Sequence, residues 1–148
     1  MNKTYKIIGF MPSYNLYSQG YPFLETIYSA LHVVDKLYIL DGSSDDTRTI
    51  LNELSTPKIS TEFKNWQFTK KNTKDGRVIA NVSNTLLNKL KKQYKHSYIY
   101  NTQANEVIHE ANYELIKNIP KIYPRYKGYW LYYYELFNNY LYGEQYRL

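Results

Sequence analysis

The sequence predicts an α/β protein with a mostly parallel central sheet flanked by helices. Short apolar runs typical of buried strands alternate with longer segments in which apolar residues recur every three or four positions. Residues that start or stop helices lie between the two kinds of segment. Alternation of this kind is typical of a parallel sheet. The length of 148 residues fits a single domain with one core.

The first strand and helix are expected within the first 35 residues. Lys6–Met11 is a short apolar run that stops at Pro12, as a buried strand would. Pro22 is typical of a first helical residue, because a helix leaves the N–H of that position unpaired. The apolar face of this helix would consist of Leu24, Ile27, Leu31 and Val34.

A second strand is expected at Lys36–Leu40, ending at Asp41-Gly42. The polar run that follows is typical of a helix N-terminus, where acidic residues are favoured. We therefore interpret Asp45 and Asp46 as helix-start residues rather than ligands. The buried side of this helix would be Ile50, Leu51 and Leu54, with Pro57 just past its end.

The remaining elements follow the same alternation. Residues 58–68 fit either a short strand or a packed loop containing Ile59, Phe63, Trp66 and Phe68. Gly76 precedes a helix whose predicted apolar face is Ile79, Val82, Leu86 and Leu90. Ser97–Thr102 is predicted to be a third strand, and Val107–Ile119 a helix that Pro120 ends.

Composition excludes several classes of protein. The absence of cysteine excludes a disulfide scaffold and thiolate zinc sites. Aromatic residues make up 18% of the chain, too many for a disordered protein. The first residues lack a long apolar run, and no stretch approaches the ~20 residues of a membrane helix. We therefore expect no signal peptide or transmembrane segment, and a cytoplasmic location.

The net charge of +6 comes from one segment. Residues 64–95 contain nine lysines and arginines against Asp75 alone, so the rest of the chain is slightly acidic. For Lys89, Lys91, Lys92 and Lys95 we favour a solvated helix face. Contact with a nucleic acid, through phosphate binding and base stacking on nearby aromatics, is a less favoured alternative.

Polar residues follow three of the predicted strands. These segments are Pro12–Asn15, Asp41–Thr47 and Gln103–Glu106. In parallel α/β sheets the carboxyl ends of the strands lie at one edge, and ligands bind there. The three segments therefore predict a ligand site better than they predict part of a core.

The same segments resemble the inverting glycosyltransferases of family 2, which have the GT-A fold. Met11–Asn15 is similar to the Pro-x-Tyr-Asn-like turn that ends the family's first strand. Asp41–Thr47 resembles its Asp-Asp-Gly-Ser-x-Asp-x-Thr pattern, with Leu40 in place of the first Asp. Asn72–Asn81 is similar to the family's basic helix region, and the resemblance covers roughly residues 5–110.

The resemblance implies a single GT-A-like domain over residues 1–148. Residues 1–110 would bind a nucleotide-diphosphate sugar, and residues 111–148 would form a short, tyrosine-rich acceptor side. The implied activity is transfer of the sugar, with inversion, to a glycan, protein or lipid acceptor. The implied nucleotide-sugar-binding residues are Pro12, Ser13, Tyr14, Asn15, Asp41, Gly42, Ser43, Arg77 and Gln103.

Two of these positions have more specific implied roles. Asp41 would accept hydrogen bonds from the nucleoside, as its family counterpart does. Arg77, with Lys70 and Lys71, would reach the diphosphate.

A divalent cation, Mn²⁺ or Mg²⁺, is the implied cofactor, since it would neutralise the charge of the departing diphosphate. The family's Asp-x-Asp position reads Gln103-Ala104-Asn105 here, which leaves Asn105 and Glu106 as candidate ligands. Because only Glu106 carries charge, we expect weaker metal binding than in the family, or none. Alternatively, these residues simply close a strand. The neighbouring His109 and Glu110 fit a surface pair.

An inverting transfer needs a base that deprotonates the acceptor. Glu135 and Glu144 are candidates, and a solvated surface glutamate is the alternative for both. They lie in a tail with nine tyrosines between Tyr123 and Tyr146. These aromatics fit a sugar-stacking cleft, strands that complete the sheet, or a surface that contacts a partner or a membrane. A second copy of the chain would supply further acceptor-site walls in a homodimer.

Other functions remain open. A nucleotide-binding module that kept the frame and lost catalysis is the main alternative, because the acidic motif is degraded. A basic, aromatic-rich nucleic-acid-binding protein is less favoured, and a nucleotidyltransferase is a distant possibility.

Overall fold

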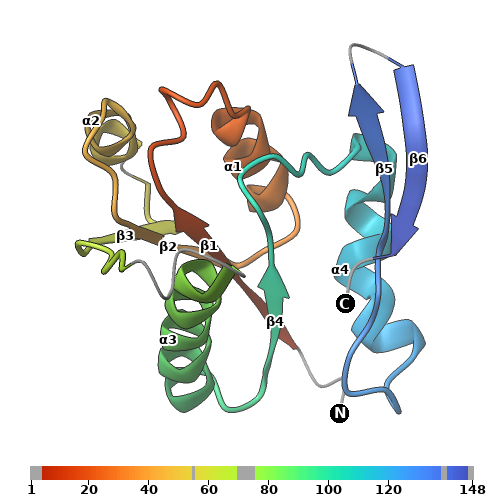
Figure 1. Cartoon of the computed structure of the whole chain (residues 1–148). Coiled ribbons are helices and arrows are strands. Elements are labelled where there is room, and N and C mark those ends of the chain that lie inside the picture. Colours follow the sequence, from red (N-terminus) through yellow and green to blue (C-terminus); the bar gives the residue numbers. More distant parts are fainter. Residues whose placement is uncertain (1–4, 55, 70–75, 138–139, 147–148) are drawn as a thin grey trace. The chain divides into compact units, whose positions relative to one another are not determined.

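The computed structural model describes residues 5–54, 56–69, 76–137 and 140–146, and it has an α/β architecture (Figure 1). The chain forms two compact units, residues 1–117 and residues 118–148. The first unit contains a fully parallel sheet with helices on both faces. The α/β class and the parallel sheet predicted from the sequence are confirmed.

The sheet of the first unit has four strands in the order β3-β2-β1-β4. The strands are β1 (Lys6–Ser13), β2 (Lys36–Asp41), β3 (Ile59–Phe63) and β4 (Ser97–Asn101). The chain moves outward from β1 through β2 to β3, and then returns to the other side of β1 as β4. This Rossmann-like order changes direction between β1 and β4, the position at which parallel α/β sheets bind ligands.

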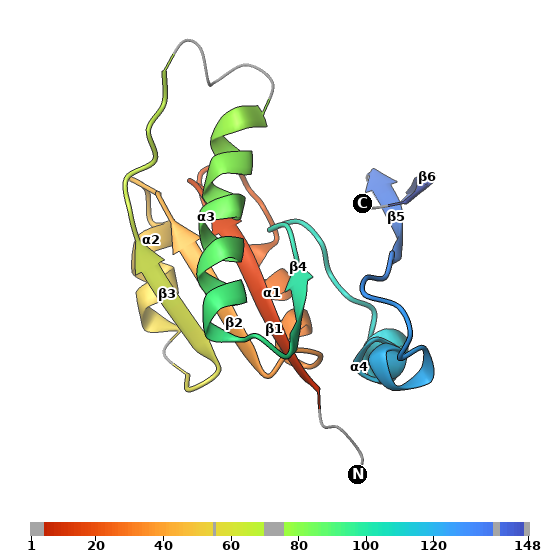
Figure 2. The same cartoon turned by 90° about the horizontal axis from the view of Figure 1, so that it is seen from below.

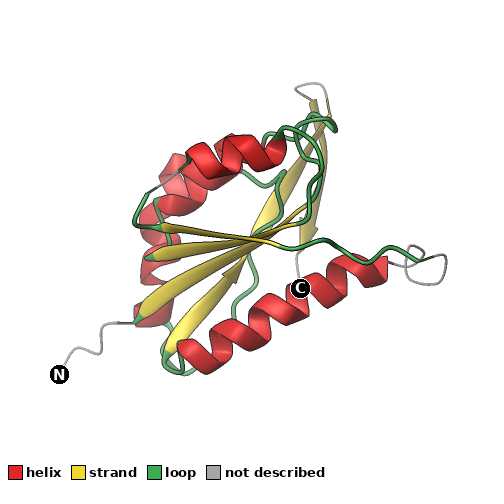
Figure 3. Ribbon diagram, turned by 90° about the vertical axis from the view of Figure 1, so that its left-hand side faces the viewer, coloured by secondary structure: helices red, strands yellow, loops and turns green. Residues whose placement is uncertain are grey.

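Helices cover the two faces of this sheet. The helices α1 (Phe23–Leu31) and α2 (Thr47–Glu53) contribute to the core on one face, and α3 (Arg77–Gln93) packs on the other (Figure 2). Figure 3 shows the strands from the side, with α3, the longest helix, along one face. Each helix connects two successive parallel strands, as such crossovers require.

Strand β1 is buried on both faces, which explains its uninterrupted apolar sequence. Ile7 and Met11 contribute to the core shared with α1 and α2. Ile8 and Phe10 contribute to the core shared with α3. The alternation follows from the two-residue period of a strand.

The first strand continues through Pro12 to Ser13, two residues beyond the predicted end at Met11. A proline cannot donate to a ladder, so it is tolerated in a sheet only where its N–H is not needed. The pairing of β1 with β4 ends at Phe10 and Asn101, while Pro12 still pairs in register with Leu40 of β2. Pro12 therefore lies beyond the part of β1 that has neighbours on both sides.

The buried face of α3 differs by one position from the prediction. Val78, Leu86 and Leu90 are buried, whereas Ile79 is 46% exposed. Val82 packs against the same core. The buried residues thus keep a spacing of four from Val78 onward, which turns Ile79 toward solvent.

The helix predicted at Val107–Ile119 begins later and runs past its proline. A short 3₁₀ helix at Glu110–Asn112 is followed by α4 (Tyr113–Ile122), which contains Pro120. The backbone N–H of Ile108 donates to the hydroxyl of Ser29 on α1 instead of entering a helix. Pro120 removes a single hydrogen bond from the last turn of α4, and the helix ends two residues later.

The tyrosine-rich tail forms its own sheet. In the second unit β5 (Tyr132–Phe137) and β6 (Tyr140–Tyr146) pair as antiparallel strands, and the two form a separate sheet. The alternative in which these aromatics complete the main sheet is therefore wrong, because β5 and β6 pair with each other. Tyr123, Tyr126, Trp130, Tyr132 and Tyr134 are exposed.

Replacement of Leu90 by alanine tests the packing of α3. Leu90 has no exposed surface. We expect Leu90→Ala to lower the free energy of unfolding by about 2–4 kcal/mol, because it leaves a cavity between α3 and the sheet. Ile79→Ala, on the exposed side of the same helix, should change it by less than about 0.5 kcal/mol. Urea unfolding followed by circular dichroism measures both, and equal losses would contradict the assigned face.

Candidate functional site

A buried carboxylate lies at the carboxyl edge of the sheet. Asp41, the last residue of β2, is completely buried. One of its oxygens, Oδ1, accepts hydrogen bonds from the hydroxyls of Ser13 (2.7 Å) and Ser43 (2.6 Å). The other oxygen, Oδ2, accepts from the backbone N–H of Ser43 at 3.1 Å. Because an ionised carboxylate only accepts hydrogen bonds, both hydroxyls are donors here.

The turn after β1 is fastened to the loop after β2 through Asn15. Its backbone N–H donates to the hydroxyl oxygen of Ser43 at 2.7 Å, and its side-chain Oδ1 accepts from the N–H of Ser44 at 2.8 Å. Asn15 has a φ of 49°, in the left-handed region. Asparagine tolerates this conformation better than most residues, which gives this position of the motif a backbone role.

A second connection joins the same two loops at the start of α2. The carboxylate of Asp45 accepts from the N–H of Thr47 (3.1 Å) and from the N–H of Ser18 (2.9 Å). The hydroxyl of Thr47 accepts from the N–H of Tyr17 at 2.9 Å. The interpretation of Asp45 as a helix-start residue is confirmed. Asp46 occupies the N-cap position without a side-chain hydrogen bond to the helix.

The pKa of Asp45 is shifted by these contacts. Burial on its own would raise it, but the hydrogen bonds from Thr47 and Ser18 outweigh burial and lower the pKa from 3.8 to about 2. Asp45 is therefore ionised throughout the physiological range.

Arg48 places a cation beside the buried carboxylate. Its Nε lies 3.8 Å from Oδ2 of Asp41, and its guanidinium carbon is 5.2 Å from the centroid of the Phe63 ring. The side chain is 40% exposed, but Nε itself is buried and has no hydrogen-bond partner. Arg48 thus compensates part of the charge of Asp41 through an ion pair whose 3.8 Å separation is too long for a hydrogen bond.

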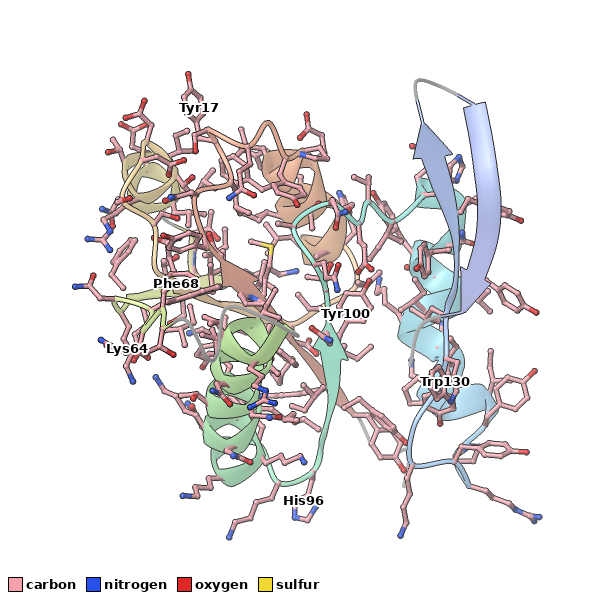
Figure 4. All side chains as sticks on the ribbon, viewed as in Figure 1. Tyr17, Lys64, Phe68, His96, Tyr100 and Trp130 are labelled. Atoms are coloured by element: carbon pink, nitrogen blue, oxygen red, sulfur yellow. The ribbon has the colours of Figure 1, made fainter. Side chains whose placement is uncertain are left out.

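Three aromatic rings gather over this edge of the sheet. Tyr14 stacks on Trp66, with ring centroids 5.2 Å apart and planes at 26°. The centroid of the Phe68 ring lies 4.7 Å from that of Tyr14 and 6.3 Å from that of Trp66. We call these three residues the aromatic cluster. Figure 4 labels Phe68 in the segment that follows β3.

The indole of Trp66 rests directly on the backbone at Gly42. A Cβ atom at Gly42 would lie 2.2 Å from the indole Cδ1 and 2.6 Å from Cγ and Nε1. No real Cβ approaches another atom so closely, so this packing requires glycine at position 42.

The predicted metal segment forms a tight turn after β4. The N–H of Gln103 donates to the carboxylate of Glu106 at 3.1 Å, and the N–H of Glu106 donates to the carbonyl of Gln103 at 3.1 Å. Asn105 is exposed. The carbonyl of Ala104 accepts from the hydroxyl of Thr26, which ties the turn to α1. Amide and carboxylate oxygens of these residues have the chemistry that a hard divalent cation prefers.

The other predicted residues belong to other segments of the chain. Arg77 is the exposed first residue of α3, and Lys70 and Lys71 lie outside the described residues. Glu135 and Glu144 belong to the hairpin of the second unit, where Glu135 pairs with Gly143 and Glu144 with Tyr134. Their roles as acceptor bases stay predictions.

Within the first unit the structure brings together Ser13, Asn15, Asp41, Ser43 and the ring of Tyr14. Sequence reasoning did not identify Arg48, Trp66 and Phe68 as residues of this edge. A glycine directly after a strand is one signal for Trp66, because it indicates close approach by another group. The sequence does not indicate which group approaches, because Trp66 lies 24 positions after Gly42 (66 − 42) and no local motif spans that separation.

Comparison with protein-family models gives no match to this chain, and comparison with curated proteins gives none either. Among the residues that the structure describes, no helix has the length and apolar character needed to cross a membrane. The fold and the carboxyl edge define a parallel α/β protein with a Rossmann-like sheet.

The pKa of Asp45 predicts a pH-dependent contribution to stability. Because the pKa is lowered on folding, the contribution is present above about pH 4 and is lost as the pH falls towards 2. Asp45→Asn should lower the free energy of unfolding at pH 7 by about 1 kcal/mol, less than the full pKa shift corresponds to because solvent screens this carboxylate, and this difference should shrink between about pH 4 and pH 2. Asp46→Asn is the control and should cost only about 0.3 kcal/mol. A difference that stays constant down to pH 2 would contradict the role of Asp45.

Gly42→Ala tests the packing of Trp66. The added Cβ should displace the indole, since the two cannot occupy the same space. In a Trp130→Phe background Trp66 is the only tryptophan. There, Gly42→Ala should shift the fluorescence emission maximum to longer wavelength and increase quenching by acrylamide. Gly128→Ala is the control, because an added Cβ would meet no atom within 4 Å there. Gly20 also lies in open space, but its positive φ would strain any other residue. An unchanged spectrum in Gly42→Ala would contradict the contact.

Proposed function

We propose that the carboxyl edge of this sheet binds a nucleoside-diphosphate sugar and that the protein is a glycosyltransferase. The observation that carries the proposal is the set of hydrogen bonds that joins the Pro12–Asn15 turn to the Asp41–Ser44 loop. Both segments resemble family 2 glycosyltransferases; the match at Asp41–Thr47 is the more specific of the two, and the Pro12–Asn15 match is weak on its own. They meet beside the change of strand direction, where such sheets bind nucleotides.

The proposed site has a nucleoside end and a diphosphate end. Tyr14 offers a ring face, and the buried Asp41 carboxylate is the hydrogen-bond acceptor assigned to the nucleoside. Three of the roughly four acceptor sites of the Asp41 carboxylate are in use, and the side chain is completely buried, so a neighbouring group such as Ser13 or Ser43 must move before a ligand reaches it. Arg77 is the residue proposed to contact the diphosphate.

The turn after β4 would hold a divalent cation. Glu106 supplies a carboxylate, and Gln103 and Asn105 supply amide oxygens. The cation, when bound, would neutralise the diphosphate leaving group. In the transfer itself an acceptor hydroxyl attacks the anomeric carbon, the bond from that carbon to the diphosphate oxygen breaks, and a base takes the hydroxyl proton. Glu135 and Glu144 remain the proposed bases.

A nucleotide-binding module without transfer activity is the second candidate. It is favoured by one observation, the engagement of the Glu106 carboxylate with the N–H of Gln103. Glu106 is the only acidic residue among positions 103–106, and part of its capacity already stabilises its own turn. Slow hydrolysis of a nucleotide sugar by the purified protein separates the two candidates. The glycosyltransferase would catalyse it, whereas the binding module would bind the nucleotide without hydrolysing the donor.

The nucleic-acid alternative is less favoured. Lys89, in the middle of the basic face of α3, forms an ion pair with Glu62 of β3. Partial neutralisation of this kind reduces the phosphate affinity of the face. A steep fall of oligonucleotide affinity with salt would favour the alternative.

Titration with UDP, GDP and ADP, with and without Mn²⁺, tests the proposed site. We expect binding of at least one diphosphate, and tighter binding with Mn²⁺. Glu106→Gln should remove most of the Mn²⁺ effect, because it removes the carboxylate charge of the turn. Glu110→Gln, four residues further on, is the matched control and should keep the effect. Calorimetry measures these affinities, and the absence of binding of all three diphosphates under both conditions would refute the function.

A further inference from the structure

The indole of Trp66 occupies a central position at the carboxyl edge. It contacts the backbone at Gly42, the residue that follows Asp41, and stacks on Tyr14 at the end of the β1 turn. Trp66 itself comes from the segment after β3. A ring from a third segment therefore covers the two segments that form the nucleoside end of the proposed site.

The indole is held without satisfying its polar atom. The Nε1 of Trp66 is buried and has no hydrogen-bond partner. A buried indole N–H usually finds a partner, and leaving it unpaired is unfavourable. Stacking and apolar contact hold the ring in place against this cost. The indole therefore occupies this position through ring and backbone contacts and without a hydrogen bond of its own.

The segment that carries Trp66 lies outside the ladder of the sheet. The backbone hydrogen bonds between β2 and β3 continue as far as Lys64, whose N–H donates to the carbonyl of Asp41 at 2.8 Å. Residues 64–69 belong to no helix or strand, and they follow β3, which is an edge strand. Movement of the indole away from Gly42 therefore requires no strand pair to break.

We propose that Trp66 occupies the subsite of a planar ring and that a nucleobase replaces the indole against Tyr14. This inference rests on the proposed nucleotide binding and adds an intramolecular competitor to it. Both the indole and a base present a flat aromatic face to the Tyr14 ring. Exchange restores one stacking contact for each that is lost, and it frees the unpaired Nε1 to reach solvent.

Occupation of the site by the indole of Trp66 lowers the apparent affinity of the site for a nucleotide. If the indole leaves its position for about a tenth of the time, the apparent dissociation constant is about tenfold larger than that of the open site. Removal of the indole should recover this factor. This sign distinguishes a competitor from a binding contact, since removal of a contact weakens binding.

The first experiment observes the indole directly. In the Trp130→Phe protein, Trp66 is the only source of tryptophan fluorescence. Addition of the diphosphate that binds best in calorimetry should shift its emission to longer wavelength and increase acrylamide quenching. Calorimetric binding with an unchanged Trp66 spectrum would overturn the inference and leave the proposed function intact.

The second experiment measures affinity. We expect Trp66→Ala to bind the same diphosphate about three- to tenfold more tightly than the unaltered chain. Tyr17→Ala is the matched control, since Tyr17 is a 56% exposed aromatic residue of the loop after β1 that lies outside the aromatic cluster, and it should change affinity less than twofold. Weaker binding by Trp66→Ala would overturn the inference, because Trp66 would then be part of the binding surface.

The two experiments separate this inference from the function on which it rests. A lack of binding by both the unaltered chain and Trp66→Ala refutes nucleotide binding and the inference together. Circular dichroism establishes whether Trp66→Ala is folded, and the fluorescence experiment decides the inference if it is not.

Discussion

The geometry of the carboxyl edge depends on one buried charge, the carboxylate of Asp41. Ser13 and Asp41 are paired across β1 and β2, so the strand register itself places the hydroxyl beside the carboxylate. A shift of register by one residue would turn one of the two side chains to the opposite face of the sheet. A buried carboxylate without its hydrogen bonds is costly, and this cost penalises every register except the observed one.

The same charge organises the loops beyond the strands. Ser43 donates to Asp41 and accepts from the N–H of Asn15, so the position of the β1 turn is set through a hydroxyl that the carboxylate orients. The β1 turn then sets the position of the Tyr14 ring, on which Trp66 stacks. A chain of short-range contacts thus connects a residue inside the sheet to a ring near the surface, and each step is a hydrogen bond or a ring contact rather than a long helix or strand.

Most of the first unit could be predicted from the sequence because its signals are local. The apolar run of β1 and the capping residues of α2 act over a few positions, and both elements lie near their predicted places. The extension of β1 to Ser13 depends on its pairing with β2, which continues after the pairing with β4 has ended, and the exposure of Ile79 depends on how α3 packs on the sheet. Trp66 was unpredictable for the same reason, since nothing adjacent to it in the sequence indicates Gly42 as its contact.

The two ends of the proposed site are built to different extents. At the nucleoside end, Ser13, Asn15, Asp41 and Ser43 are already joined by hydrogen bonds, so little order has to be gained when a ligand arrives. At the diphosphate end, Glu106 is a single carboxylate that also accepts a bond from its own turn. If binding energy comes mainly from the nucleoside end, the exchange of one ring for another against Tyr14 has a larger effect on affinity than the metal does. The position of Trp66 over Gly42 would then control occupancy of the whole site.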